Sequence, residues 1–259
     1  LQIICDLAVH PFHHRLTHFL EHYSPESDEE VLGKPRFLND RALAEPVSAL
    51  ELVECEQRRL LADLPTFVDA LRDDVEQSTY SAEVLRAAGA KVVTECGHFL
   101  TALADRNQSR EVLERSIVLR DRNDLINSLQ ETLVELNHAV VSVGDAPEVS
   151  NLIHSLVEGL HMMLTLLAET EAQPNPDDLE LLRSLTHDRS DLMDNIRHRL
   201  LGMGESLTPG LQRSVFSATS LFERSVWLMR RYVLLLDVTR FQADAAGLAD
   251  EADALPVPN

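Results

Sequence analysis

Apolar residues recur along most of this chain at steps of three and four positions, which is the spacing of one face of an α-helix. The first such run begins at Pro46, and Leu50, Val53 and Leu60 follow at this spacing. Pro65 lies within the run and is expected to kink or divide the helix, because proline lacks the backbone donor of the helix interior. Strand-like alternation is nowhere sustained. The pattern therefore predicts an all-α fold.

The rest of the chain repeats this pattern in long runs separated by short breaker sequences. The breakers include GDAP, QPNPDD and GMGESLTPG, and short loops of this kind place consecutive helices antiparallel. The predicted helices cover residues 47–74, 78–104, 109–143, 148–170, 179–201 and 211–241. The sequence thus predicts two tandem three-helix bundles, residues 37–145 and 146–242, between an N-terminal apolar, His-rich helix with its linker (1–36) and an acidic flexible tail (243–259).

Composition and charge narrow the classes of function. The 259 residues carry 43 acidic and 23 basic side chains, for a formal net charge of −20. Such a surface repels nucleic-acid phosphates, so we expect no nucleic-acid partner. The same surface is compatible with a bound divalent or ferric cation.

Cysteine usage and the chain ends bear on location. Cys5, Cys55 and Cys96 lie far apart without a CxxC pair, which is typical of reduced thiols in a cytoplasmic setting. The sequence predicts no apolar run of the roughly 18 residues that span a membrane. Because the chain begins at Leu1 rather than at a methionine, we expect it to be part of a longer protein.

Three strings, in their order along the chain, resemble the PhoU-like region of sodium/phosphate cotransporters. FLNDRALAEPVSALELVECEQRRL is similar to the start of that region, and DRSDLMDNIRHRLL and LFERSVWLMRRYVLLL are similar to phrases in its second half. The resemblance covers residues 37–241. It implies a tail of two three-helix PhoU-like bundles behind a membrane part that moves phosphate with sodium.

The resemblance also implies a function and a location. The chain would be a regulatory or interaction domain on the cytoplasmic side of the plasma membrane, modulating phosphate uptake. Its partner would be the membrane portion of the same transporter or a phosphate-signalling protein. Residues 1–20 would be the end of the last membrane helix or its cytoplasmic extension. The alternative is a free-standing cytoplasmic PhoU-type adaptor that binds metal ions and a protein partner. A homo-oligomer is compatible with either.

PhoU proteins carry a Glu/Asp-x-x-x-Asp motif in each bundle, and its spacing puts two carboxylates on one helix face. Here LRDRND has Arg120 in place of the first acid, Asp124 as the second and Asp121 out of register. FERSVW keeps Glu223 and has Trp227 where the second acid belongs. The resemblance therefore names Asp121, Asp124 and Glu223 as candidate metal ligands, while a solvated helix face is the alternative interpretation.

A second candidate metal site lies in the predicted helix 179–201. His187, Asp191, Asp194 and His198 follow one another at helical spacing, almost opposite the apolar stripe, and side chains of these types can chelate a cation. Ordinary solvent-facing residues also occupy such positions. The set therefore predicts either a metal site or a solvated face.

The N-terminal segment carries a stripe of histidines at steps of four. His10, His14, His18 and His22 could bind a transition metal or respond to pH, because the histidine pKa lies at about 6.5. A polar juxtamembrane helix face is the alternative interpretation.

No pattern in the sequence supports catalysis. A nucleophile with its base, a phosphate loop that follows a strand and an HExxH helix are all missing from the sequence, so we expect no enzymatic activity. The aromatic and sulfur side chains of the last helix are expected to pack in the core: Phe222, Trp227, Met229 and Tyr232.

Overall fold

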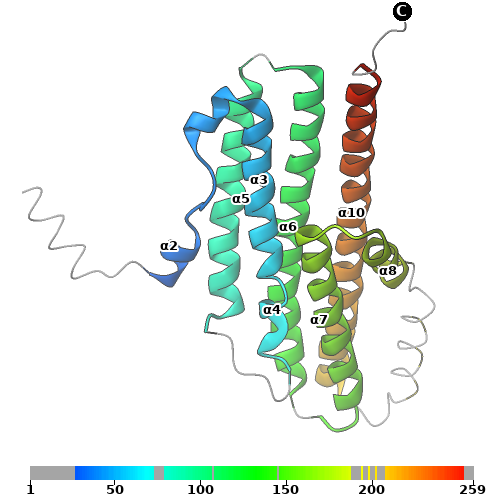
Figure 1. The fold of residues 1–259 in the computed structure, drawn as a ribbon. Coiled ribbons are helices and arrows are strands. Elements are labelled where there is room, and N and C mark those ends of the chain that lie inside the picture. The colour runs from blue at the N-terminus through cyan, green and yellow to red at the C-terminus, as the bar shows by residue number, and fades with distance from the viewer. Residues whose placement is uncertain are drawn as a thin grey trace, which may run out of the picture.

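The computed structural model describes residues 27–72, 79–106, 108–144, 146–187 and 208–253, together with Asp194, His198 and Gly202. All regular secondary structure in these ranges is helical, which confirms the predicted all-α class (Figure 1). The elements are α2 (Asp28–Leu32), the 3-10 helix η1 (Asp40–Ala44), α3 (Pro46–Ala62), α4 (Thr66–Asp69), α5 (Ala82–Ala104), α6 (Arg110–Val143), α7 (Ser150–Ala172), α8 (Pro176–Thr186) and α10 (Pro209–Asp253).

Local signals in the sequence set most helix ends. Ser81 and Ser109 accept hydrogen bonds from the backbone N–H groups three residues on, at the starts of α5 and α6. Gly144, at φ 63°, ends α6 in a conformation that favours glycine. Pro65 lies in the turn between α3 and α4, so the prediction that it divides the first helix is confirmed.

α6 is the central helix of the bundle. It packs against α3, α5 and α10 and lies between α5 and α10 in Figure 1. α6 and α10 run antiparallel, since Ser142 near the end of α6 lies 2.9 Å from Ser214 near the start of α10, while Arg122 meets Tyr232. α7 and α8 pack against the first half of α10, and α7 also packs against α3.

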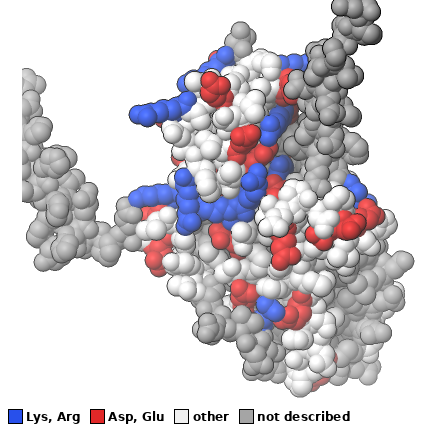
Figure 2. Space-filling model, in the orientation of Figure 1, with Lys and Arg blue, Asp and Glu red and all other residues white. Residues whose placement is uncertain are grey.

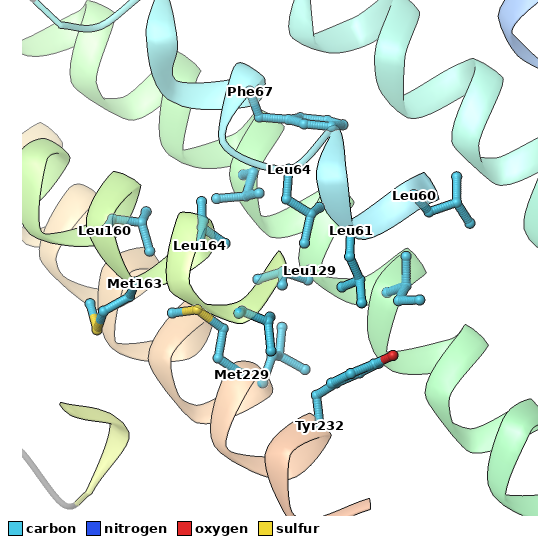
Figure 3. Close-up of a cluster of buried hydrophobic side chains, with 14 of the residues drawn as sticks. Leu60, Leu61, Leu64, Phe67, Leu129, Leu160, Met163, Leu164, Met229 and Tyr232 are labelled. Carbon is cyan, nitrogen blue, oxygen red and sulfur yellow. The ribbon is translucent and has the colours of Figure 1, made fainter. Parts of the chain in front are cut away.

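One hydrophobic core runs through all of the long described helices. In the close-up of Figure 3, side chains from both predicted bundles lie against one another. The labelled residues are Leu60 and Leu61 from α3, Leu64 from the turn that follows, Phe67 from α4, Leu129 from α6, Leu160, Met163 and Leu164 from α7, and Met229 and Tyr232 from α10. The two halves therefore share their apolar interior, and the division into two bundles stays a prediction.

Three features differ from the sequence prediction. The indole of Trp227 is 52% exposed, so its predicted place in the core is wrong, whereas Phe222, Met229 and Tyr232 are buried as predicted. The backbone of α10 is helical as far as Asp253, inside the segment that the sequence predicts to be a flexible tail. The helix expected to begin at residue 179 begins at Pro176, because proline suits the first helical turn.

α7 differs from the prediction that no apolar run in the chain is long enough to span a membrane. By length and composition it is the one described helix that could cross a membrane. Leu160, Leu164 and Leu167 on this helix are fully buried. In this structure its apolar face therefore packs into the bundle.

Candidate functional site

The candidate metal ligands do not converge in the described part of the chain. Asp121 and Asp124 are exposed on α6, and Glu223 is half-buried on α10. No group of three or more His, Cys, Asp or Glu side chains suited to a metal occurs among the described residues. The sequence-predicted ligands Asp121, Asp124 and Glu223 thus appear as separate surface positions.

The other two predicted sets extend beyond the described residues. His187, Asp194 and His198 are exposed, and Asp191 lies outside the described residues. The N-terminal stripe lies wholly outside them: His10, His14, His18 and His22. Both sets stay predictions.

The most distinctive polar feature is a buried cluster that we call the buried junction: Arg122 on α6, Glu171 at the end of α7 and Tyr232 on α10. Their exposed fractions are 2%, 8% and 2%. Arg122 Nη2 is paired with Glu171 Oε1, and Arg122 Nε and Nη2 donate to Tyr232 Oη at 2.9 and 2.7 Å. The guanidinium carbon lies 5.0 Å from the centre of the Tyr232 ring. The junction therefore joins a helix of the first half to two helices of the second.

Helical periodicity brings Arg122 into the interior. Arg122 shares one face of α6 with Leu119 and Ile126, and both of these apolar side chains are fully buried. Arg122 is not among the residues predicted from the sequence, because those predictions concern the acids on either side of it, Asp121 and Asp124. The signal was present: a charged residue occupied a position in register with the apolar stripe.

The junction holds an arginine cation. Burial opposes the charged guanidinium of Arg122, but its interactions with Tyr232 and Glu171 outweigh burial and raise its pKa. Burial raises the pKa of Glu171, and the charge of Arg122 opposes this effect. Burial likewise raises the pKa of Tyr232, so its phenol stays neutral at ordinary pH. The cluster is thus a buried ion pair with a neutral phenol beside it.

A buried amide pair joins Gln57 on α3 to Asn123 on α6, the residue that follows Arg122 along the chain. Gln57 Nε2 donates to Leu119 O at 2.7 Å and to Asn123 Oδ1 at 2.8 Å. Gln57 Oε1 and Asn123 Nδ2 are buried without a hydrogen-bond partner within the described structure. Unsatisfied buried groups of this kind disfavour the folded state by about 1–3 kcal/mol each, so these two atoms offset part of the stability that the hydrogen bonds of Gln57 provide.

Ion pairs of Glu54 on α3 lie at and just beneath the surface. Glu54 accepts from Arg115 Nη2 at 2.8 Å and lies 3.9 Å from Arg58 Nη2. The carboxylate is 12% exposed, whereas the side chains of Arg58 and Arg115 are 44% and 30% exposed. Figure 2 shows Lys and Arg side chains gathered in a band across the middle of the face that carries α3. Glu54 thus lies beneath Arg58 and Arg115 on this face.

Glu56 fixes the segment before α3. This buried carboxylate accepts from the backbone N–H groups of Arg36 and Phe37, the latter at 2.6 Å. Its second oxygen lies 2.9 Å from Arg59 Nη2, and Arg59 Nη1 donates to Leu32 O at 3.3 Å. The cluster therefore ties the α2–η1 segment to α3 and is structural.

A further ion-pair cluster links α4 to α7. Arg72 donates to both oxygens of Glu158, at 2.8 and 2.9 Å, and His161 Nε2 lies 3.2 Å from Asp69 Oδ1. The hydrogen bond from Arg72 lowers the pKa of Glu158. Since these groups are partly exposed, the cluster makes a modest link between the two halves.

A hollow of about 380 Å³ lies among α4, the start of α5 and the second half of α6. Phe67, Tyr80 and Val141 line it, and Glu83 Oε1 lies 2.8 Å from His138 Nε2 at its edge. A hydrogen bond from its own backbone and one from His138 lower the pKa of Glu83. Both side chains are more than half exposed, so this pair lacks the desolvation typical of a tuned acid and base.

The described thiols differ in environment. Burial raises the pKa of Cys96 to about 12, which keeps the thiol protonated and unreactive at neutral pH. Cys55 is partly exposed on α3. Cys96 is therefore a core residue rather than a nucleophile.

Comparisons with known proteins add no further constraint. No family model, curated protein or solved structure matches this chain.

Proposed function

We propose that this chain is a PhoU-like regulatory and interaction domain of a sodium-dependent phosphate transporter, acting at the cytoplasmic side of the plasma membrane to modulate phosphate uptake. The resemblance of the three strings in residues 37–60, 188–201 and 221–236 motivates the assignment. The observation that carries a regulatory role is the buried junction, because it couples helices from the two halves of the chain. The function is conformational, with partner binding at bundle surfaces.

Separating the helices at the junction would break a buried ion pair, which costs free energy. Pulling α6 away from α7 and α10 would leave Arg122 and Glu171 without their partners in an apolar interior. Loss of one partner from such a pair disfavours the fold by about 3–5 kcal/mol. We therefore expect α6, α7 and α10 to move together at the junction when one end of the bundle is displaced.

Transport measurements test this proposal. We expect cells that carry the complete transporter gene to take up labelled phosphate with altered regulation when the residues after Lys34 are removed. We expect Arg122→Met to alter regulation in the same direction, and the exposed neighbour Arg120→Met to leave it unchanged. Unchanged uptake and unchanged regulation in the truncated protein would contradict the proposal.

A free-standing adaptor that binds metal and a protein partner is the second candidate. The net charge of −20 and the partly kept acidic motif at Asp121 and Asp124 motivate it, because carboxylate oxygens suit hard cations. Genomic sequence upstream of Leu1 separates the two candidates: a start codon without apolar helices supports the adaptor. Metal analysis of the gently purified chain tests the cation, and a clearly substoichiometric content of Fe, Zn, Mn and Ni would exclude it.

A further inference from the structure

α10 carries a continuous row of exposed positions on its outward side, which we call the outward stripe. Its members follow one another at alternating steps of four and three residues, and nearly all of the positions between them are buried or half-buried. This alternation places the members on one face of α10, along which a second helix has room to lie. The members are Arg213, Ser217, Ser220, Arg224, Trp227, Arg231 and Leu234.

The stripe exposes large apolar side chains in its second half. Trp227 and Leu234 are 52% and 54% exposed, and they lie two helical turns apart on the same face. The guanidinium of Arg231 lies 5.1 Å from the Trp227 ring, which holds the indole in a defined position. Tryptophan and arginine are the side chains that most often dominate binding energy at protein interfaces. This end of the stripe therefore has the features of a binding surface.

The charge of the stripe is opposite to that of the chain. Arginine occupies three of its positions, Arg230 lies exposed beside it, and none of its positions is acidic. Arg224 Nη1 lies 3.9 Å from Glu135 Oε2, and both side chains are more than half exposed, so this contact is weak. The chain as a whole has a net charge of −20. A basic and aromatic stripe on such a protein is complementary to an acidic partner.

We propose that the outward stripe of α10 binds an acidic amphipathic helix of a partner protein. The partner's apolar side chains would pack on Trp227 and Leu234, and its carboxylates would meet the arginines. Ser217 and Ser220 leave room for larger side chains of the partner. A second copy of this chain is a poor occupant, because two-fold packing of the stripe on itself would bring Arg224 against its own copy. The inference depends on the surface of α10 and holds for a transporter domain and for an adaptor.

Binding of a designed probe tests the inference on the full 259-residue chain. Trp227 is the only tryptophan, so its emission reports directly on the stripe. The probe is a fluorescein-labelled helical peptide with leucine at the seam positions and glutamate beside them. A peptide with lysine in place of glutamate is its control. We expect the glutamate peptide to bind, with a change in Trp227 emission and a rise in anisotropy that added salt reduces.

Matched variants assign the binding to the stripe. Arg224→Gln/Arg230→Gln/Arg231→Gln should weaken binding by about tenfold or more. Arg41→Gln/Arg106→Gln/Arg110→Gln removes the same charge from exposed positions elsewhere and should leave affinity within about twofold. Circular dichroism of both variants checks that the helices are retained.

Four results would overturn the inference. They are equal loss of binding in both triple variants, equal binding of the lysine peptide, binding of anionic phosphatidylserine vesicles in place of the glutamate peptide, and a dimer in sedimentation that only the stripe variant abolishes. Phosphate uptake is measured separately from peptide binding. A negative binding result would therefore contradict the role of the stripe and leave the proposed function standing, and a negative uptake result would do the opposite.

Discussion

Removal of one member of the buried junction should destabilise the fold far more than removal of both charges. Arg122 and Glu171 are 2% and 8% exposed, so water cannot replace a lost partner. In Glu171→Ala the guanidinium keeps Tyr232 Oη as its remaining hydrogen-bond partner in the junction, at 2.7 and 2.9 Å. We expect a loss of about 3–5 kcal/mol, a large share of a total stability of about 5–15 kcal/mol.

Arg122→Ala should show a distinctive pH dependence. Without the guanidinium, the Glu171 carboxylate is left in a site where burial already raises its pKa above the ordinary value of 4.5. A raised folded pKa stabilises the fold below the unfolded pKa, and this stabilisation is lost as pH rises through the folded pKa. The destabilisation of Arg122→Ala should therefore grow from about pH 4.5 upward.

The double replacement Arg122→Met/Glu171→Leu removes both charges and keeps apolar volume. We expect it to be neutral or more stable by about 1–4 kcal/mol. The free energy of unfolding is measured by urea unfolding, followed by circular dichroism and by Trp227 emission. The four proteins compared are the unmodified chain, Glu171→Ala, Arg122→Ala and the double replacement. Arg120 and Glu169 are exposed neighbours of the junction residues along the chain, so Arg120→Ala and Glu169→Ala serve as controls. Each should change the free energy of unfolding by no more than about 0.5 kcal/mol. Single losses below about 1 kcal/mol, or a double variant whose loss equals their sum, would refute the reasoning.

Other side chains give independent predictions. A Cβ at position 89 would lie less than 3.0 Å from the buried Gln130 amide, so Gly89→Ala should lower the free energy of unfolding by about 1–3 kcal/mol. Thermal unfolding should show this as a lower melting temperature, and Gln130→Ala should relieve the loss. In native protein, peptide mapping after iodoacetamide should find Cys55 modified well before Cys96, whose pKa burial raises to about 12; equal rates would contradict this. Burial raises the pKa of Asp63 from 3.8, so the stability gain from Asp63→Asn should grow with pH above about 3.8, and a pH-independent difference in urea midpoints would contradict it.

Much of the candidate site lies beyond what the sequence could predict. The exposed positions of Asp121 and Asp124 agree with the solvated-face interpretation of the acidic motif. Arg122 could have been noticed, because its position coincides with the apolar stripe of α6. Its partners could not, since Glu171 and Tyr232 come from helices far along the chain. The spacing of residues within each helix does not predict which faces of α6, α7 and α10 pack together.

The sequence alone determined the helices. Pro46, Pro65 and Gly144 act on the backbone within a few residues, so the all-α class and most helix ends follow from local chemistry. Only the tertiary structure decided that both halves share one core and that Trp227 faces solvent. The physical reason is that periodicity defines which residues share a face, whereas packing energy depends on which faces come together.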